Sequence, residues 1–438
     1  MQLYTKITIG LVLGVIVGLA VNLAGFTETF AWQSVAMPVM DFVGNAFIRA
    51  IMMIVIPLVV ASLTVGVASL GDMKTLGRMG GKTVAYYLFT TSIAITLGLV
   101  LALVIRPGAG LSPEARDSLA GEFAEQAGGA VGIADEAPTI WETLIGMIPS
   151  NPVAAAAEGN LLPLIIFVII FAAAITRVIP SRRETILSFF HGINDASMVV
   201  IHWIMKTAPY AVFALITVVI SRFGLEVLQS LAIYAGVVAL GLVLHATITY
   251  GTLVTVLARL NPIDFFRRIR EAQLIAFSTS SSNATLPVTM EVAQENLGIS
   301  KSTSSFVLPL GATINMDGTA LYQGVATVFI AQVYGFDLGI GALLTIVLTA
   351  TLASIGTAGV PSAGIIILVL VLNSVGLGAQ AAAGIALILG VDRILDMIRT
   401  AVNITGDLSC AAVVGRSEGE VLITGNPKDA TVVSGREG

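Results

Sequence analysis

The sequence predicts an all-α polytopic membrane protein, and three observations carry that prediction. The chain of 438 residues is 56% hydrophobic and only 11% charged, whereas soluble domains have about 25% charged residues. Apolar runs of about 20 residues, the length that a helix needs to cross a bilayer, recur along the chain. Two later apolar segments are interrupted in the middle by Ser, Gly and Pro.

Six apolar runs come first and predict membrane helices. They cover residues 7–24, 37–70, 83–105, 152–179, 188–221 and 228–258. The first run resembles a signal peptide, but it lacks a small-x-small cleavage site and is followed by further runs, so we interpret it as a retained helix. Beyond them, the interrupted segments 263–297 and 340–376 alternate with the spans 303–333 and 380–414.

Basic residues predict the orientation. If the six runs alternate in direction, most basic residues fall on one side of the membrane, and that side is then cytoplasmic. We expect both termini to lie on this cytoplasmic side. These residues are Lys6, Lys74, Arg78, Lys82, Arg177, Arg182, Arg183, Arg259, Arg267, Arg268 and Arg270. The opposite loops hold Arg106, Arg116 and Arg222. We expect residues 106–142 to form a solvated acidic external loop without a binding role. We expect residues 416–438 to form a loose cytoplasmic tail.

Composition also excludes several classes of function. The single cysteine, Cys410, excludes an internal disulfide and a cysteine-based metal cluster. His191, His202 and His245 have no metal-ligand spacing, so we expect no zinc site. A net charge of −5 does not suggest binding to nucleic acid.

The two interrupted segments predict re-entrant hairpins. Their breaks read FSTSSSNATLPVT at 277–289 and ASIGTAGVPSAGIII at 353–367. The apolar halves 342–353 and 365–373 are each too short to cross a bilayer comfortably. Half-helix ends offer N–H groups to anions and C=O groups to cations. The alternation of broken segments and spans predicts an inverted repeat, which is typical of a transporter's substrate site. Flexible surface loops are the alternative, and their apolar flanks argue against it.

The last span carries the densest chemistry, in DRILDMIRTAVNITGD at 392–407. At about 100° per residue, one helix face collects most of its polar side chains. They are Asp392, Asp396, Arg399, Thr400, Asn403 and Asp407. The guanidinium of Arg399 suits a carboxylate, and Asp396 suits an ammonium group. The pair therefore predicts recognition of both ends of an acidic amino acid.

A carboxylate also lies in TINMDGTALYQ at 313–323, where Asn315 and Thr319 flank Asp317. An aspartate at the centre of a membrane helix costs about 2.5–3.5 kcal/mol. Asp317, Asp392, Asp396 and Asp407 outweigh Arg393 and Arg399 by two charges, which predicts bound cations. Asp317 and Asp407 are hard oxygen ligands suited to a small cation.

Four motifs together resemble those of the glutamate transporter homologue family, the dicarboxylate/amino acid:cation symporters that include the excitatory amino acid transporters. They are SSSNATLPVT, NMDGTALYQ, GTAGVPSAG and DMIRTAVNITGD, and the resemblance covers nearly the whole chain. It implies eight transmembrane helices, two re-entrant hairpins, a homotrimer and elevator-type transport with the second hairpin as outer gate. The implied protein lies in the inner membrane of a prokaryote and takes up L-aspartate or L-glutamate with sodium ions.

The resemblance divides the chain into a scaffold and a transport domain. Residues 1–75 and 151–222 would form scaffold helices 1–2 and 4–5, with an external loop at 106–150. The transport domain would comprise helix 3 (76–105), helix 6 (223–262), hairpin 1 (263–298), helix 7 (299–335), hairpin 2 (336–378) and helix 8 (379–415). A cytoplasmic tail would occupy residues 416–438.

The resemblance also implies the site residues. Arg399 would hold the substrate's side-chain carboxylate and Asp396 its amino group, and the pocket would be completed by Thr400, Asn403, Thr319, Ser282, Val360 and Gly364. One sodium site would use Asp407 with carbonyls of Gly311, Asn315 and Asn403. A second would use carbonyls of Thr313, Met316, Ser354, Ile355 and Thr357. A third would use Asp317, Asn315, Tyr87, Thr90 and Thr91.

Sequence details favour sodium and an acidic amino acid. Asp407 and the NMDGT form resemble sodium-coupled members, and Asp396 favours an amino acid over a plain C4-dicarboxylate. One departure is that Ser280 and Met397 occupy positions where members of the family carry an arginine, although Arg393 lies one turn before Met397. The rival readings are a proton-coupled glutamate or C4-dicarboxylate symporter, an ion channel, and a membrane enzyme with a nucleophile at Ser280–Ser282. No His or Lys base lies near those serines, so we expect no enzyme.

Overall fold

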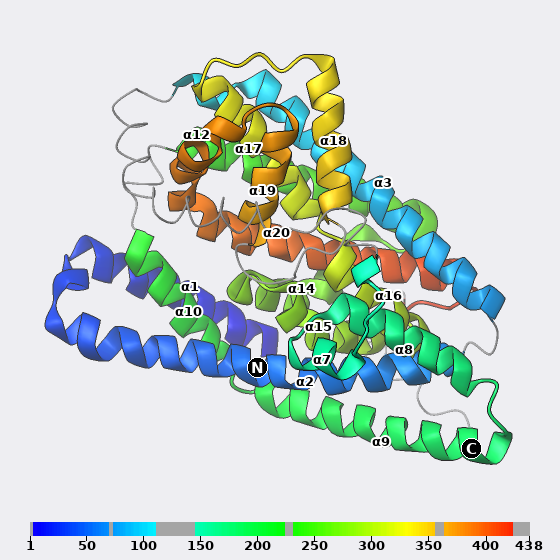
Figure 1. Ribbon diagram of the computed structural model, residues 1–438. Helices are drawn as coiled ribbons and strands as arrows, with labels where there is room; N and C mark the ends of the chain where they lie inside the picture. Colours follow the sequence, from blue (N-terminus) through cyan, green and yellow to red (C-terminus); the bar gives the residue numbers. More distant parts are fainter. Residues whose placement is uncertain (1–2, 70–72, 111–144, 224–230, 355–362, 424–438) are drawn as a thin grey trace.

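The computed structural model describes residues 3–69, 73–110, 145–223, 231–354 and 363–423, and the regular structure within these ranges is entirely helical (Figure 1). The principal helices are α1 (Leu3–Leu23), α2 (Met37–Ser69), α3 (Met73–Ile105), α7 (Pro152–Ala157), α8 (Leu161–Ile175), α9 (Pro180–Met205), α10 (Ala208–Phe223), α12 (Ala232–Leu244), α13 (Gly251–Leu253), α14 (Pro262–Thr279), α15 (Ser282–Glu291), α16 (Lys301–Ile314), α17 (Asp317–Val333), α18 (Ile340–Ser354), α19 (Ala363–Ser374) and α20 (Ala381–Ser417). The all-helical prediction is confirmed for these residues.

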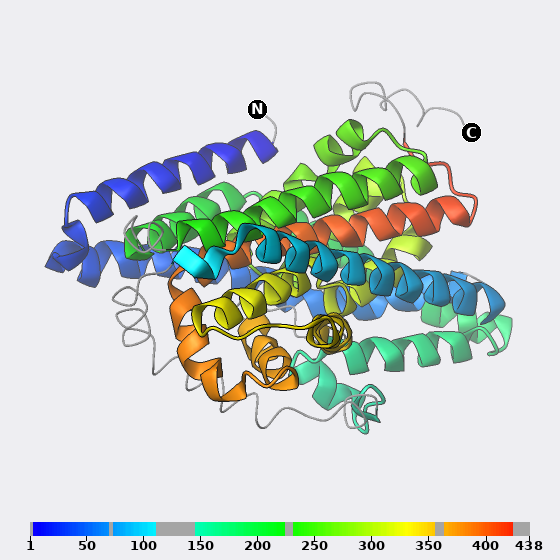
Figure 2. The same ribbon diagram turned by 90° about the horizontal axis from the view of Figure 1, so that it is seen from above.

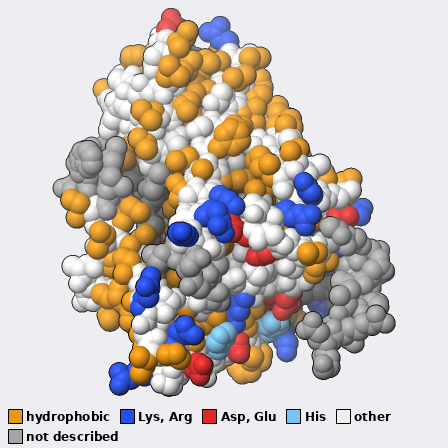
Figure 3. Space-filling model, turned by 90° about the vertical axis from the view of Figure 1, so that its right-hand side faces the viewer, with side chains coloured by type: hydrophobic (Ala, Val, Ile, Leu, Met, Phe, Trp, Pro, Cys, Tyr) orange, Lys and Arg blue, Asp and Glu red, His pale blue; other side chains and the backbone are white. Residues whose placement is uncertain are grey.

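Several helices have the length and apolarity of membrane spans. Within the described ranges they are Thr5–Leu23, Trp32–Val65, Lys74–Ala109 and Ala232–Ala258, and α9 with α10 forms a fifth if this pair, bent by 56°, is one span. Large apolar side chains face outward, as on a lipid-facing surface; Phe42 and Val104 are 74% and 75% exposed. On the face in Figure 3, hydrophobic side chains cover the upper part and charged ones gather below. The chain is therefore a helical membrane protein.

Two hydrophobic clusters divide the interior. One joins α2, α8, α9, α10 and the first half of α3 to α14, α15 and α16 and to the second half of α20. The other joins α3, α12, α17, α18 and α19 to the first half of α20. Figures 1 and 2 show α20 running through the middle of the molecule between these groups. The polar face of α20 therefore lies where the two clusters meet.

Helix α1 packs closely along α10 because its glycines face that helix. A Cβ added at Gly14 would lie 2.9 Å from the carbonyl oxygen of Phe213, and one added at Gly18 would lie 2.8 Å from Cβ of Ile220. Small residues at four-residue spacing let membrane helices approach in this way. This tight pair lies at one side of the molecule, away from α3 and α17 (Figure 1).

The two interrupted segments form pairs of contacting helices. In the first, α14 ends at Thr279 and α15 begins at Ser282; Ser280 between them has a positive φ of 51°. The Ser281 hydroxyl caps α15 by accepting a hydrogen bond of 3.1 Å from the Ala284 N–H. In the second pair, α18 contacts α19, and the intervening residues 355–362 lie outside the described ranges.

Three expectations differ from the structure. The span expected at 303–333 is interrupted, because Asn315 is extended and separates α16 from α17. The run at 188–221 is likewise two helices, α9 and α10. Residues 416–423 are not loose: Leu422 is buried, and the Glu420 carboxylate accepts a hydrogen bond of 3.0 Å from the Ser300 N–H at the start of α16. Most of the expected acidic external loop, residues 111–144, lies outside the described ranges.

Candidate substrate and cation site

The centre of the site is Arg399 on α20, whose side chain is fully buried. Its Nε donates a hydrogen bond of 2.8 Å to Asp396 Oδ1, and its Nη1 donates one of 3.0 Å to Asp392 Oδ1. The Tyr322 ring lies under the guanidinium, 4.2 Å from its carbon to the ring centroid. The third nitrogen, Nη2, is buried and has no hydrogen-bond partner among the described residues. The guanidinium thus retains a free donor at the protein interior.

Two residues from other helices lie beside that free nitrogen. A Cβ added at Gly364, at the start of α19, would lie 3.3 Å from Arg399 Nη2 and 2.8 Å from Thr319 Cγ2. Thr319 lies on the first turn of α17 and is 6% exposed. Gly364 therefore lies so close to Thr319 and the guanidinium that a side chain there would have to displace one of them.

Asn403 joins α20 to the break between α16 and α17. Its Oδ1 accepts a hydrogen bond of 2.7 Å from the Gly318 N–H, one of the free N–H groups at the start of α17. Its Nδ2 lies 3.4 Å from Thr319 Oγ1 and 3.4 Å from Met316 Sδ. Thr400, one turn earlier, is buried and donates to the Asp396 carbonyl at 2.7 Å. The structure thus brings together most of the predicted substrate residues.

Two predicted substrate residues are not part of that group. Ser282 is buried at the start of α15, and no hydrogen bond joins it to Arg399 or Asp396 within the described residues. Val360 lies outside the described ranges. Met397 is buried in the hydrophobic cluster that includes the α14–α15 pair, and Ser280 is buried at its tip. Arg393 is half-buried rather than buried like Arg399.

A second polar centre lies around Asp407, which is 1% exposed. Asn315 Nδ2 donates to Asp407 Oδ1 at 2.8 Å and to the Asn403 carbonyl at 3.0 Å. Gly311 lies directly against the carboxylate, since a Cβ there would collide with Asp407 Oδ1 and with the Tyr87 hydroxyl. Asp407 Oδ2 and Asn315 Oδ1 are buried without hydrogen-bond partners in the described part of the chain. These oxygens fit a small cation, which prefers carboxylate and carbonyl ligands.

A third centre surrounds Asp317, which is fully buried at the start of α17. Thr91 on α3 donates to its Oδ1, and the Tyr250 hydroxyl donates to its Oδ2 at 2.7 Å. His245 Nε2 lies 3.2 Å from the same Oδ2. Protein donors thus stabilise this carboxylate in addition to the N-terminus of the helix.

The remaining predicted cation ligands do not form a single group among the described residues. Thr90 donates to the Tyr87 carbonyl at 3.2 Å, within its own helix. Thr313 and Ser354 are buried, the latter at the last residue of α18. Ile355 and Thr357 lie outside the described ranges. The predicted second sodium site is therefore only partly placed.

Sequence reasoning missed His245 and Tyr250, and it left Asp392 and Tyr322 out of the binding set. His245 and Tyr250 bound a π-helical turn that follows α12. Polar residues inside an otherwise apolar run were the available signal. Asp392 was noted on the polar face of α20, but its pairing with Arg399, seven residues away, follows only from the folded geometry.

The protein is helical and membrane-embedded, and it buries incompletely paired guanidinium and carboxylate groups near broken helices. This combination is typical of transporters. Comparison with known families agrees: the sodium:dicarboxylate symporter family model matches residues 3–417. The chain belongs to the sodium:dicarboxylate symporter family. It is a symporter and not an enzyme, as expected.

Relatives of this chain are similar over nearly their whole length. The proton/sodium-glutamate symport protein of Bacillus subtilis (strain 168) is 39% identical over 95% of this chain and 93% of its own length. The proton/glutamate-aspartate symporter of Escherichia coli (strain K12) is 35% identical over 94% and 92%. The C4-dicarboxylate transport protein of Bacillus subtilis (strain 168) is 32% identical over 96% and 95%.

Proposed function

We propose that the protein takes up an acidic amino acid, L-aspartate or L-glutamate, together with sodium ions across the plasma membrane of a bacterium. The observation that carries this proposal is the buried Arg399, whose Nη2 has no hydrogen-bond partner in the described part of the chain, while Asp396 lies beside the guanidinium. A guanidinium binds a carboxylate through parallel N–H donors. The side-chain carboxylate of the substrate would take Nη2 and displace part of the Arg399–Asp396 contact, which frees Asp396 for the substrate's ammonium group.

The choice of an amino acid rests on Asp396. A C4-dicarboxylate has no ammonium group, and it would place negative charge beside Asp392 and Asp396. An amino acid instead brings a cation to Asp396 and a carboxylate to Arg399, so both buried charges gain a partner. The names of the glutamate and glutamate-aspartate symporters among the relatives support this substrate class.

The choice of sodium rests on Asp407 and Asn315. Asp407 Oδ2 and Asn315 Oδ1, which have no hydrogen-bond partner among the residues described, belong to side chains next to Gly311 and the Asn403 carbonyl, at the break between α16 and α17. A cation held there would neutralise Asp407 and fix Asn403, which in turn contacts Thr319 and Gly318. Cation binding would therefore prepare the substrate pocket, which is the physical basis of coupling.

The transport movement would be of the elevator type in a homotrimer. The helices α1, α2 and α7–α10 would form the fixed scaffold, and α3 and α12–α20 would form the moving part. The whole chain would have eight spans and two re-entrant hairpins. One hydrophobic cluster joins the scaffold helices α2, α8, α9 and α10 to α14, α15 and α16, so the movement would occur along this contact. Both termini would be cytoplasmic.

The test is uptake of radiolabelled L-aspartate and L-glutamate into proteoliposomes that contain the purified protein. One set of vesicles has an inward sodium gradient, and the other an inward proton gradient in sodium-free buffer. We expect uptake with the sodium gradient alone. Uptake driven only by the proton gradient would contradict sodium coupling. If neither gradient drives uptake of either amino acid, the proposed substrate class is contradicted, and C4-dicarboxylates are tested next.

Proton coupling is the second candidate, and the pair of His245 and Asp317 favours it. The His245 imidazole lies 3.2 Å from the buried Asp317 carboxylate, and imidazoles commonly act as proton shuttles. The relative from Escherichia coli is named as a proton-coupled symporter. The vesicles with the proton gradient decide between the two couplings.

A further inference from the structure

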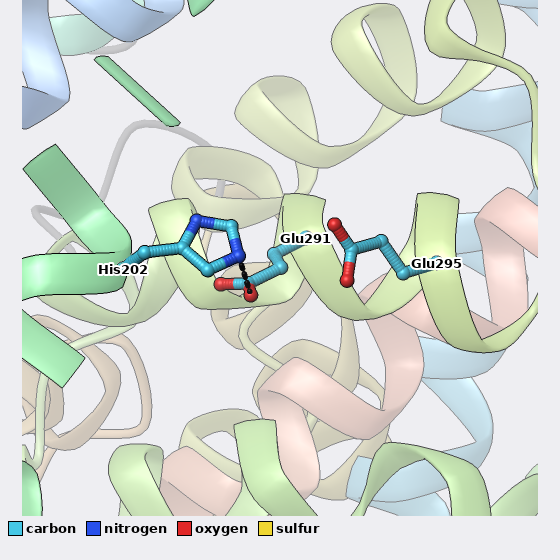
Figure 4. A group of neighbouring side chains, drawn as sticks. All are labelled: His202, Glu291 and Glu295. Carbon is cyan, nitrogen blue, oxygen red and sulfur yellow. Dashed lines mark ion pairs between the residues drawn. The ribbon is translucent and has the colours of Figure 1, made fainter. Parts of the chain in front are cut away.

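Three side chains outside the substrate site lie close enough together to bind a metal ion, although the spacing of the histidines in the sequence did not indicate a metal site. They are His202 near the end of α9, Glu291 at the end of α15 and Glu295 in the π-helical turn Val292–Asn296 (Figure 4). One ligand atom from each residue lies within 4.8 Å of the others. The histidine and the two glutamates lie about 90 residues apart in the sequence, so a search for local metal-binding motifs does not find them.

The histidine is oriented as a metal ligand. Its Nδ1 lies 2.7 Å from the Met198 carbonyl oxygen, and because a carbonyl only accepts, Nδ1 carries the hydrogen. In the neutral ring Nε2 then holds the lone pair, and it faces Glu291 Oε1 at 3.1 Å. Metal-binding histidines commonly donate their other ring N–H to a backbone carbonyl in this manner. Two facing acceptors require a proton or a cation between them.

The glutamates supply further ligand capacity. The Glu291 side chain is 17% exposed, and its Oε2 is buried without a hydrogen-bond partner among the described residues. Glu295 is exposed and follows four residues later, so its carboxylate can rotate toward the same point. Zn²⁺ binds histidine nitrogen and carboxylate oxygen at about 2.0–2.2 Å, so the three side chains would draw closer together around a bound ion.

We propose that His202, Glu291 and Glu295 form a Zn²⁺ site that joins α9 to the α15 end of the first hairpin. A mixed nitrogen and oxygen ligand set suits Zn²⁺ better than Ca²⁺ or Mg²⁺, which take oxygen ligands. Water completes a four-coordinate shell.

The bound ion inhibits transport, because it holds together two elements that separate during the movement. This consequence rests on the proposed elevator function, in which α9 is fixed and α15 moves. A second contact crosses nearby: Asp195, two turns before His202 on α9, pairs with Lys301 at the start of α16 at 3.5 Å. The same stretch of α9 therefore faces the part of the chain that would move.

Calorimetric titration of the purified full-length protein with ZnCl₂ tests the site. We expect one site that is weakened at least 10–100-fold by His202→Ala and by Glu291→Gln. The matched controls are His191→Ala and Glu184→Gln, which remove exposed side chains of the same types from α9. Equal affinity in the wild type and His202→Ala, or no binding to the wild type, would overturn the proposal and leave a plain ion pair between His202 and Glu291.

Uptake measured with and without Zn²⁺ tests the inhibition separately. We expect Zn²⁺ to slow wild-type uptake at least tenfold, EDTA to reverse the effect, and His202→Ala to be insensitive. Zn²⁺ that binds but leaves wild-type uptake unchanged would overturn the inhibitory role. A wild type that takes up no acidic amino acid even without Zn²⁺ would contradict the proposed function instead, and the titration would still decide the site.

Discussion

Arg399 donates a hydrogen bond of 2.8 Å to Asp396, three residues earlier on the same helix, and both side chains are buried. Asp392 accepts a second one from the same guanidinium. Two carboxylates and one guanidinium leave a buried excess of one negative charge. An arriving acidic amino acid brings two carboxylates and one ammonium group, so the pocket can exchange internal pairs for pairs with the substrate. The substrate also adds one negative charge to the excess, which the proposed co-transported cations would offset.

Arg399→Cys should abolish uptake of L-aspartate and L-glutamate, because no other guanidinium is buried in the site within the described residues. The change also leaves Asp392 and Asp396 buried without their partner, which costs about 3–5 kcal/mol of stability. Arg399→Lys keeps the buried positive charge but loses the planar set of N–H donors. It therefore distinguishes a loss of substrate recognition from a loss of stability. Arg393→Gln is the matched control on the same helix, and uptake that survives in Arg399→Lys at the wild-type rate would contradict bidentate recognition.

Asp407→Asn should raise the sodium concentration for half-maximal uptake at least tenfold, equivalent to about 1.4 kcal/mol. The amide keeps an oxygen for the Asn315 hydrogen bond but removes the charge that holds the cation. Initial uptake rates at fixed aspartate and varied sodium measure the effect. Asp264→Asn, at the start of α14 with a half-buried side chain, is the control; an identical sodium titration in both variants would refute a sodium site at Asp407.

Gly364→Ala should raise the KM for the acidic substrate about tenfold while the melting temperature changes little. The new methyl group would lie 2.8 Å from Thr319 Cγ2 and 3.3 Å from Arg399 Nη2, so it fills the space that the substrate carboxylate needs. Gly341→Ala on α18, where a Cβ meets nothing within 4 Å, is the matched control. Equal KM values for the two variants would place the substrate elsewhere.

The sequence predicted the polar face of α20 correctly, because helical periodicity depends only on local spacing. Asp396, Arg399, Asn403 and Asp407 recur every three or four residues, and all are buried in the structure. The motifs likewise identified the family. These signals are local, so they do not require knowledge of which helices pack together.

The break at Asn315 could not be read from hydropathy, because apolar residues continue on both sides of it. The contact between His245 and Asp317 joins residues 72 positions apart. The group formed by His202 and Glu291 likewise depends on the packing of α9 against α15. Such pairings follow from tertiary packing, for which a single sequence carries no signal.

His245→Gln tests the coupling ion through the Asp317 centre. Glutamine keeps a donor for Asp317 Oδ2 but lacks the imidazole, so with sodium coupling we expect sodium-driven uptake within about threefold of wild type. Proton coupling through this pair predicts loss of the uptake that a proton gradient drives in sodium-free buffer. Initial rates under the two gradients measure the effect, and His191→Gln, at an exposed site on α9, is the control.

Glu418 connects the end of α20 to α3, and this contact should weaken in acid. Arg78 Nε donates to Glu418 Oε1 at 3.1 Å, and Lys82 Nζ lies 2.7 Å from the same oxygen. The hydrogen bond from Arg78 lowers the pKa of Glu418 from 4.5 to about 2, and Lys82 acts in the same direction. A lowered pKa means that the ionised carboxylate stabilises the fold.

This stabilisation is present above about pH 4.5 and is lost as the pH falls toward 2. Because Arg78 and Lys82 remain partly exposed, we expect Glu418→Gln to cost about 1 kcal/mol at neutral pH. Melting temperatures in detergent at several pH values measure the difference from wild type, which should shrink between pH 4.5 and 2. Glu184→Gln, at an exposed position on α9, is the control, and a difference that stays constant down to pH 2 would show that the charge of Glu418 does not hold α20 to α3.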